Sequence, residues 1–334
     1  MDLMIILLAV VLATAIVIAY LLFIWWLDRY EREPFWVVLL TFLWGGIGGT
    51  GISCFVNSLT GLVLALGVGL ATAQTLTTVV VAPIVEEFVK ALVFVFLVLV
   101  GNQLDNRTDG LIYGAATGLG FACVENLYYY WSVYNPESTE VLFITIFTRT
   151  AFTALVHCIS SALLGMAIGY ARHGKGASRW VLWPVLGYVL AVFNHATWNG
   201  LTSIAQGVAE SNQGLSLLTM LFSILLVVGA SIMMFLLTLN SLNSEHKVIK
   251  RFLLEEAQRG VLPREHAEII PYWMKRRKSG WLSAQVPKEA YVKAATLLAF
   301  RHYQLERADG DRKAQYLHDI QMYRQQVQDY MKVA

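Results

Sequence analysis

The feature that most constrains this chain is a series of apolar runs, each long enough to cross a lipid bilayer. About 20 apolar helical residues span the hydrocarbon core, and the first run, from Leu3 to Trp26, contains no charged residue. The predicted spans are residues 3–26, 35–58, 84–101, 110–134, 141–172, 178–206 and 215–242. A chain with 57% hydrophobic and 14% charged residues is also no ordinary soluble domain. We therefore predict an all-α fold, a polytopic membrane helix bundle of seven or eight transmembrane helices.

Charge divides the chain near residue 242. Residues 1–242 contain 8 Lys/Arg and 12 Asp/Glu, a net charge of −4, whereas residues 243–334 contain 17 and 11, a net charge of +6. We predict a transmembrane domain over 1–242 and a basic, helical, soluble cytoplasmic domain over 243–334. Glycines and prolines divide the second domain into predicted helices at 245–260, 263–278, 288–306 and 311–332. Its basic stretch at 275–278 suits either a surface near anionic lipid or a solvated face.

The basic loops predict how the chain is oriented. The loop from Arg172 to Arg179 and the C-terminal region are rich in Lys and Arg, and so both are expected on the cytoplasmic side. Residues 60–82 are apolar but rich in Gly and Thr, which suits a weak span or a re-entrant or interfacial segment. If they do not cross, the chain has seven spans and an external N-terminus; if they cross, it has eight and an internal one. Either way, we expect an integral protein of a bacterial plasma membrane.

Two adjacent carboxylates and an amine, Glu86, Glu87 and Lys90, open the third predicted span. An ionised side chain in the bilayer centre costs about 2.5–3.5 kcal/mol on insertion scales, so three together need a reason. Lys90 follows Glu86 by four residues and Glu87 by three, and it can neutralise one of them but not both. The remaining carboxylate is free to act. The alternative is a buried ion pair that only fixes helix packing.

Polar residues of four predicted spans lie at one depth. The four are Glu86, Glu125, His157 and His195. Each lies 15 or 16 residues from the same membrane face, roughly 22–24 Å at a helical rise of about 1.5 Å per residue. Asn126 adjoins Glu125, and Asn199 follows His195 by four residues and so shares its face. Each residue alone could be an interhelical hydrogen bond, but the set at one level predicts a functional site.

Small and polar residues also define two helix faces. Gly110, Gly114 and Gly118 share a face with Glu125, which predicts close approach of a neighbouring helix. A polar stripe with spacing i, i+4, i+8 is formed by Thr153, His157 and Ser161. Both faces therefore direct their side chains toward other helices.

Carboxylates and imidazoles in one water-holding pocket suit hydrolysis. A glutamate can act as general base on water, histidines can orient that water, and an amide such as Asn199 can stabilise an oxyanion. Glu86, His157 and His195 would also supply the three ligands of a catalytic zinc, although no HExxH spacing is present. No GxSxG motif is present, so serine catalysis is not expected. The cysteines have no metal-binding spacing and suit small core positions.

A non-enzymatic alternative is a proton-coupled transporter or sensor, in which Glu86, Lys90, Glu125 and His195 form a relay. An inactive scaffold for membrane partners is a third interpretation. No nucleotide or nucleic-acid motif is present, so no nucleic-acid partner is expected.

Several strings resemble the PrsW-type intramembrane proteases, which are related to the CAAX prenyl endopeptidase and Abi superfamily. These strings are Glu31-x-Glu-Pro34, Pro83-x-x-Glu86-Glu87-x-x-Lys90, Asp109-Gly-x-x-Tyr113-Gly-x-x-x-Gly-x-Gly-Phe121-Ala-x-x-Glu125-Asn126, the single His157, and His195-x-x-x-Asn199. The resemblance covers about residues 20–205. It departs from the superfamily at Glu125, because the usual second motif there is Phe-x-x-x-His.

The resemblance implies hydrolysis of a peptide bond in the membrane, with Glu86, Glu87, His157 and His195 as catalytic residues. It implies Asn199 as oxyanion or substrate donor and Glu125 as second acid, with Lys90 and Asn126 in support. The implied substrate is a membrane-protein or lipid-anchored peptide, and the family suggests an anti-sigma factor. No cofactor is required, but zinc is an alternative, held by Glu86, His157 and His195.

Overall fold

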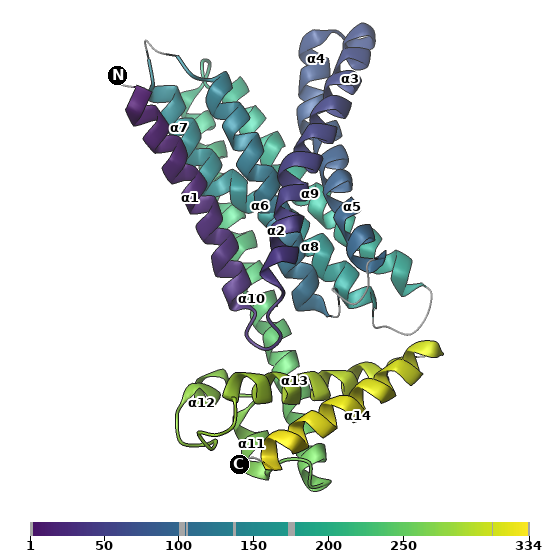
Figure 1. The fold of residues 1–334 in the computed structure, drawn as a ribbon. Coiled ribbons are helices and arrows are strands. Elements are labelled where there is room, and N and C mark those ends of the chain that lie inside the picture. Colours follow the sequence, from purple (N-terminus) through teal and green to yellow (C-terminus); the bar gives the residue numbers. More distant parts are fainter. Residues whose placement is uncertain are drawn as a thin grey trace. The chain divides into compact units, whose positions relative to one another are not determined.

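The computed structural model describes residues 3–99, 104, 106–135, 138–172, 178–308 and 310–332, and these form helices and connecting turns with no strand (Figure 1). The predicted all-α fold is confirmed. The described residues fall into two compact units, and the boundary between them lies inside one long helix, after Leu236. Unit 1 contains 3–27, 33–172 and 178–236, and unit 2 contains 28–32 with the residues from 237 onward. The predicted domain boundary at 242 stays a prediction.

Long helices that run side by side build unit 1 (Figure 1). The elements are α1 (Leu3–Leu27), α2 (Phe35–Leu43), η1 (Trp44–Gly49), α3 (Thr50–Val68), α4 (Leu70–Leu76), η2 (Thr77–Val81), α5 (Ala82–Leu99), α6 (Arg107–Ser132), α7 (Glu140–Thr148), η3 (Arg149–Thr153), α8 (Ala154–Arg172), α9 (Arg179–Gly207) and α10 (Gln213–Gln258). The η elements are π-helical segments that join their neighbours without a break.

Five of the helical stretches in the described chain are long and apolar enough to cross a membrane. They are Ile6–Leu27, Phe35–Val68, Glu140–Arg172, Arg179–Gly207 and Gln213–Gln258. Their apolar side chains point outward in large numbers, which is typical of helices in lipid rather than in water. The membrane class of the fold is confirmed, whereas the number of spans stays a prediction.

Residues 60–82 do not form a segment of their own. Residues 60–68 complete α3 and residues 70–82 belong to α4, η2 and the start of α5, and the two stretches meet at Gly69. Gly69 has φ of 79°, a left-handed conformation that glycine adopts without the steric cost of a Cβ atom. The segment 60–82 thus consists of the adjoining ends of two helical stretches joined by one glycine turn, and whether it crosses the membrane stays a prediction.

The centre of unit 1 is α6, which is buried along most of its length and packs against α8. The glycine face that the sequence predicts makes this packing, because a Cβ at Gly110, Gly114 or Gly118 would lie 2.0–2.2 Å from a backbone oxygen of α8. At Gly118 that oxygen belongs to His157. Close backbone contact between α6 and α8 thus fixes the position of His157 relative to Glu125.

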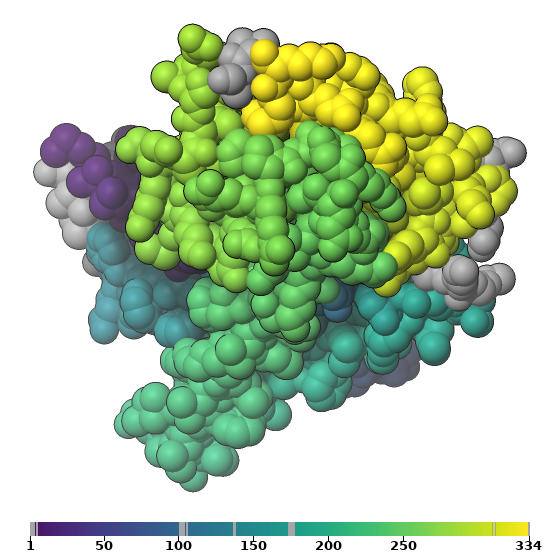
Figure 2. All heavy atoms as spheres, turned by 90° about the horizontal axis from the view of Figure 1, so that it is seen from below, coloured from purple at the N-terminus to yellow at the C-terminus, as the bar shows by residue number. Residues whose placement is uncertain are grey.

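Unit 2 has its own apolar core, formed by the end of α10 with α11 (Arg264–Ile269), α13 (Lys288–Leu305) and α14 (Asp311–Lys332). The short helix α12 (Trp273–Arg277) also belongs to this unit. Figure 2 shows α14, in yellow, lying along the surface of this unit.

Two predicted helices of the C-terminal region have other bounds in the structure. The predicted span 215–242 and residues 245–258 belong to one continuous helix, α10, because the polar residues between them include neither Gly nor Pro. The helix predicted at 263–278 is divided into α11 and α12, because Pro271 has no backbone N–H with which to continue the hydrogen bonds of α11.

Candidate active site

A cavity of about 890 Å³ in unit 1 contains most of the polar residues that the sequence places at one depth. Its lining includes Glu86, Glu125, His157, His195 and Asn199, from α5, α6, α8 and α9. These residues come together because α8 packs against both α6 and α9, and α5 contacts all three. Glu87 and Lys90 do not line the cavity but contact residues that do.

Glu87 is fully buried and holds three hydrogen bonds. Its Oε1 accepts from Lys90 Nζ at 2.8 Å and from His195 Nδ1 at 2.9 Å, and its Oε2 accepts from Ser161 at 3.1 Å. Lys90 therefore neutralises Glu87, which leaves Glu86 as the carboxylate without an ion pair to a lysine or arginine.

His157 uses both ring nitrogens. Its Nδ1 lies 2.9 Å from Lys90 Nζ and its Nε2 lies 2.9 Å from Glu125 Oε2. An ammonium group only donates, so Nδ1 accepts and the proton is on Nε2, where it is donated to Glu125. Phe121 packs against both partners, with its ring 3.9 Å from Lys90 Nζ and 5.1 Å from the imidazole ring centre.

His195 and Glu86 each retain a free electron-pair donor. Because Nδ1 of His195 donates to Glu87, its Nε2 carries the lone pair, and this atom lies 3.7 Å from Glu86 Oε2. Glu86 Oε1 accepts from Asn57 at 3.2 Å, but the buried Oε2 has no hydrogen-bond partner. A buried oxygen without a partner costs stability, so the arrangement is typical of a site that awaits a ligand or a reacting group.

The remaining predicted residues have protein partners. Asn126 accepts from Arg149 Nε at 2.9 Å, and Arg149 also pairs with Glu125. Asn199 donates to the backbone oxygen of Thr78 at 3.0 Å while it lines the cavity. One of its two amide protons is therefore already engaged.

Sequence reasoning missed Arg149 and Asn57, which both line the cavity. Arg149 is a charged residue inside the predicted span 141–172, and that signal could have identified it. Asn57 carried no such signal, because a single Asn in an apolar run more often bonds a neighbouring helix. The π-helical segments η2 and η3, which precede Glu86 and His157, were also not predicted.

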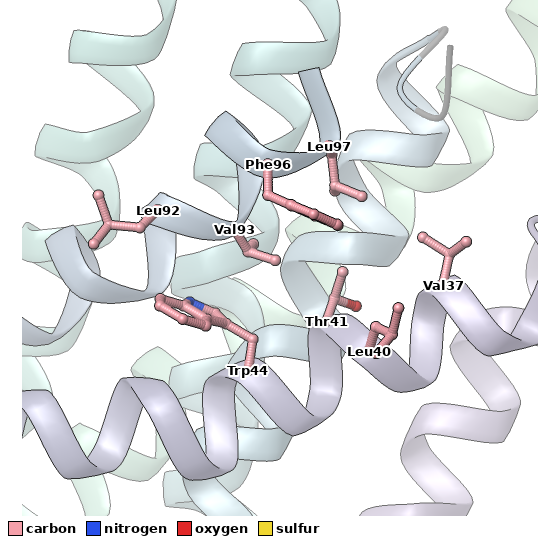
Figure 3. A pocket seen from close by; sticks show the side chains of 8 residues that line it. All are labelled: Val37, Leu40, Thr41, Trp44, Leu92, Val93, Phe96 and Leu97. Carbon is pink, nitrogen blue, oxygen red and sulfur yellow. The ribbon is translucent and has the colours of Figure 1, made fainter. Parts of the chain in front are cut away.

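A second cavity of about 300 Å³ lies between α2 and α5 (Figure 3). Its lining residues are Val37, Leu40, Thr41, Trp44, Leu92, Val93, Phe96 and Leu97. None of these is titratable. Of these two cavities, only the larger one is lined by acid–base groups.

The donor set of the larger cavity fits a zinc-type ion. One ligand atom each from Glu86, His157 and His195 lies within 4.8 Å of the others. Two tetrahedral zinc ligands at about 2.0–2.1 Å from the ion lie about 3.3 Å apart, close to the 3.7 Å between Glu86 Oε2 and His195 Nε2. The Nδ1 hydrogen bond from His195 to Glu87 is the outer-shell contact that zinc-bound histidines usually make. His157 would have to exchange one of its two hydrogen bonds to become the third ligand.

A cavity of carboxylates and imidazoles among apolar helices has the groups that an intramembrane hydrolase needs. The chain belongs to the PrsW family of intramembrane metalloproteases, whose family model matches residues 33–232. It is therefore an integral membrane protein and a peptidase, and the family resemblance of the sequence is confirmed.

Three curated relatives share the description "Protease PrsW". The protein of Geobacillus kaustophilus is 29% identical over 184 residues, which cover 55% of this chain and 75% of that one. The Bacillus subtilis protein is 26% identical over 185 residues, 54% of this chain and 77% of its own length. The Clostridioides difficile protein is 29% identical over 142 residues, which cover 42% of this chain and 56% of that one. No solved structure matches the chain significantly.

Proposed function

We propose that this protein hydrolyses a peptide bond in a membrane-embedded or juxtamembrane segment of a membrane protein, and that Glu86 and His195 act on the attacking water. The observation that carries the proposal is that Glu86 Oε2 and His195 Nε2, two atoms with free lone pairs, lie 3.7 Å apart in a large cavity. The side chains behind them are held by hydrogen bonds, so this pair is where a water molecule can be bound and polarised.

The charges of the site support this assignment. Three carboxylates, Glu86, Glu87 and Glu125, face two cations, Lys90 and Arg149. With neutral imidazoles, the net charge is −1, and Glu86 is the carboxylate without a cationic partner. It is therefore the group we assign as proton acceptor, within reach of a water in the cavity. Glu87 orients His195, and Glu125 together with Lys90 orients His157.

A zinc-type ion, which the family description favours, would be held by Glu86, His195 and His157. When bound, such an ion lowers the pKa of its water and polarises the scissile carbonyl. Glu87 would then keep His195 in the orientation that directs Nε2 into the cavity, and Lys90 would hold Glu87 in place through their ion pair. Asn199 lines the same cavity, and its second amide proton is the one we assign to the developing oxyanion.

The substrate and location are part of the proposal. The cavity suits a membrane-protein or lipid-anchored segment, and the family resemblance suggests an anti-sigma factor. The named relatives are bacterial, which supports a bacterial plasma membrane, and the basic residues from 243 onward support a cytoplasmic C-terminal region.

The test is cleavage of tagged single-pass membrane proteins, anti-sigma factors among them, by the purified protein in proteoliposomes. We expect the wild type to produce a defined fragment and Glu86→Gln to produce none, at equal abundance and thermal stability. Glu210→Gln is the matched control, because Glu210 is exposed on a loop of the same unit. Cleavage by Glu86→Gln at the wild-type rate would contradict the proposal.

A further inference from the structure

Buried oxygens without partners gather on one wall of the catalytic cavity. Among the described residues of unit 1, the buried side-chain oxygens that lack a hydrogen-bond partner belong to Ser53, Asn57, Thr77 and Glu86. All four residues line the 890 Å³ cavity. The residue Ser53 is only 1% exposed, so its hydroxyl oxygen is deeply buried. Unpaired polar groups are rare inside proteins, and four on one wall need an explanation.

The wall is a stripe along α3 that reaches Glu86. Ser53 and Asn57 are four residues apart, and Gly61 continues the same face. The Thr77 hydroxyl lies 3.3 Å from the position that a Cβ at Gly61 would occupy, so it borders this stripe from η2. At the other side, Asn57 Nδ2 donates to Glu86 Oε1 at 3.2 Å. The free oxygens thus stand beside the proposed proton acceptor.

The chemistry of these groups matches a peptide backbone. The Asn57 carboxamide oxygen only accepts, which suits an N–H donor, whereas the Ser53 and Thr77 hydroxyls can donate to a carbonyl. An intact transmembrane helix has its own backbone groups paired and offers neither. An extended or unwound segment exposes both, at the alternating spacing of a strand.

We propose that Ser53, Asn57 and Thr77 form the subsite that binds the substrate backbone in an extended conformation beside the scissile bond. This inference rests on the proposed function. Recognition at the subsite is through backbone N–H and C=O groups, so it selects unwound segments rather than a particular side chain.

The test is an amide-to-ester scan of a synthetic single-pass peptide that the wild type cleaves in proteoliposomes. Each ester replaces one backbone N–H near the scissile bond and weakens the adjoining carbonyl as an acceptor. We expect one ester that removes the N–H partner of Asn57 to lower kcat/KM of the wild type by about 2- to 10-fold, the loss of one net hydrogen bond. In Asn57→Ala the same ester should have no further effect.

Two conservative variants keep the test decisive if Asn57→Ala does not fold. Thr77→Val and Ser53→Ala each remove one hydroxyl with little change of shape, and each should abolish the effect of an ester that weakens its carbonyl partner. Ser58→Ala is the matched control, because Ser58 is exposed on α3 and lines the same cavity; it should retain every ester effect.

The outcomes separate the subsite from the proposed function. If the wild type cleaves the amide peptide but all variants show the wild-type ester profile, the subsite is wrong and the proposed function stands. If the wild type cleaves no membrane peptide, the proposed function fails and the subsite fails with it.

Discussion

Each unit of the molecule buries a carboxylate among histidine and cationic side chains, but the two carboxylates differ in how their oxygens are used. Glu256 in unit 2 has a side chain that is 0% exposed, and Arg324 donates to both of its oxygens at 2.7 Å. His302 lies 3.1 Å from Oε1, and Arg259 also donates to that oxygen. Glu86 in unit 1 receives one hydrogen bond, from Asn57, and its second oxygen has none.

The difference separates a structural cluster from a reactive one. The buried Glu256 carboxylate accepts hydrogen bonds at both oxygens and so joins α10, α13 and α14, which is a structural role. A buried charge with a free lone pair costs stability in the resting protein, and that cost is typical of functional sites. We therefore expect substitutions in the Glu86 cluster to abolish activity and substitutions in the Glu256 cluster to destabilise the fold.

The largest expected effect is on metal binding at Glu86 Oε2 and His195 Nε2, the two atoms with free lone pairs. We expect the wild type to purify with about one zinc ion per chain and to lose cleavage when a chelator removes it. His195→Ala should lose the ion, whereas His302→Ala, the matched histidine of the satisfied cluster, should keep it. Elemental analysis and chelator titration measure both. Full cleavage in the presence of excess chelator would instead assign the water activation to Glu86 and His195 without a metal ion.

The next effect is on the stability of unit 2. Glu256→Ala removes the buried carboxylate that pairs with Arg324, Arg259 and His302, and so it should destabilise the protein by about 3 kcal/mol. Glu306→Ala, which breaks the exposed pair with Arg251, should cost less than about 1 kcal/mol. Thermal unfolding of the full chain in detergent measures both. Equal losses of stability for Glu256→Ala and Glu306→Ala would contradict a structural role of the buried Glu256 cluster.

A smaller effect concerns the scaffold that holds the reactive cluster. A Cβ at Gly114 would lie 2.2 Å from the backbone oxygen of Ser161, so Gly114→Ala must push α6 and α8 apart, at about 1–3 kcal/mol. Gly51→Ala is the control, because nothing lies within 4 Å of its added methyl group. Unfolding midpoints and cleavage rates should fall together for the first variant only.

The smallest effect is a pH dependence of stability in unit 2. Burial lowers the pKa of the His266 imidazole, whose Nδ1 lies 2.9 Å from the Tyr291 hydroxyl. A lowered pKa in the folded state means that the unfolded state binds the proton more readily. The stabilisation is therefore complete above the unfolded pKa of about 6.5 and is lost as pH falls below it.

The measurement for this last effect is the unfolding midpoint between pH 7.5 and pH 5. His266→Gln should reduce the fall of the midpoint, whereas His318→Gln, at an exposed position of α14, should leave it unchanged. If the unfolding midpoint fell equally with pH in the wild type, His266→Gln and His318→Gln, His266 would not be the group responsible.

Patterns within single helices carried much of the prediction. Long apolar runs determined the membrane fold, because an apolar segment in lipid satisfies all its backbone N–H and C=O groups by forming a helix. The glycine face at Gly110, Gly114 and Gly118 followed from helical periodicity. The common depth of Glu86, Glu125, His157 and His195 needed only a fixed rise per residue and alternating spans.

Which atoms are free was decided by the tertiary structure alone. Spacing allowed Lys90 to pair with either glutamate, and the positions of Ser161 and His195 on other helices select Glu87. Asn57 and Arg149 reach the cavity because distant helices bring them there. Local periodicity determines the face and depth of a side chain, but its hydrogen-bond partners come from other helices, so only their packing decides which lone pairs remain free.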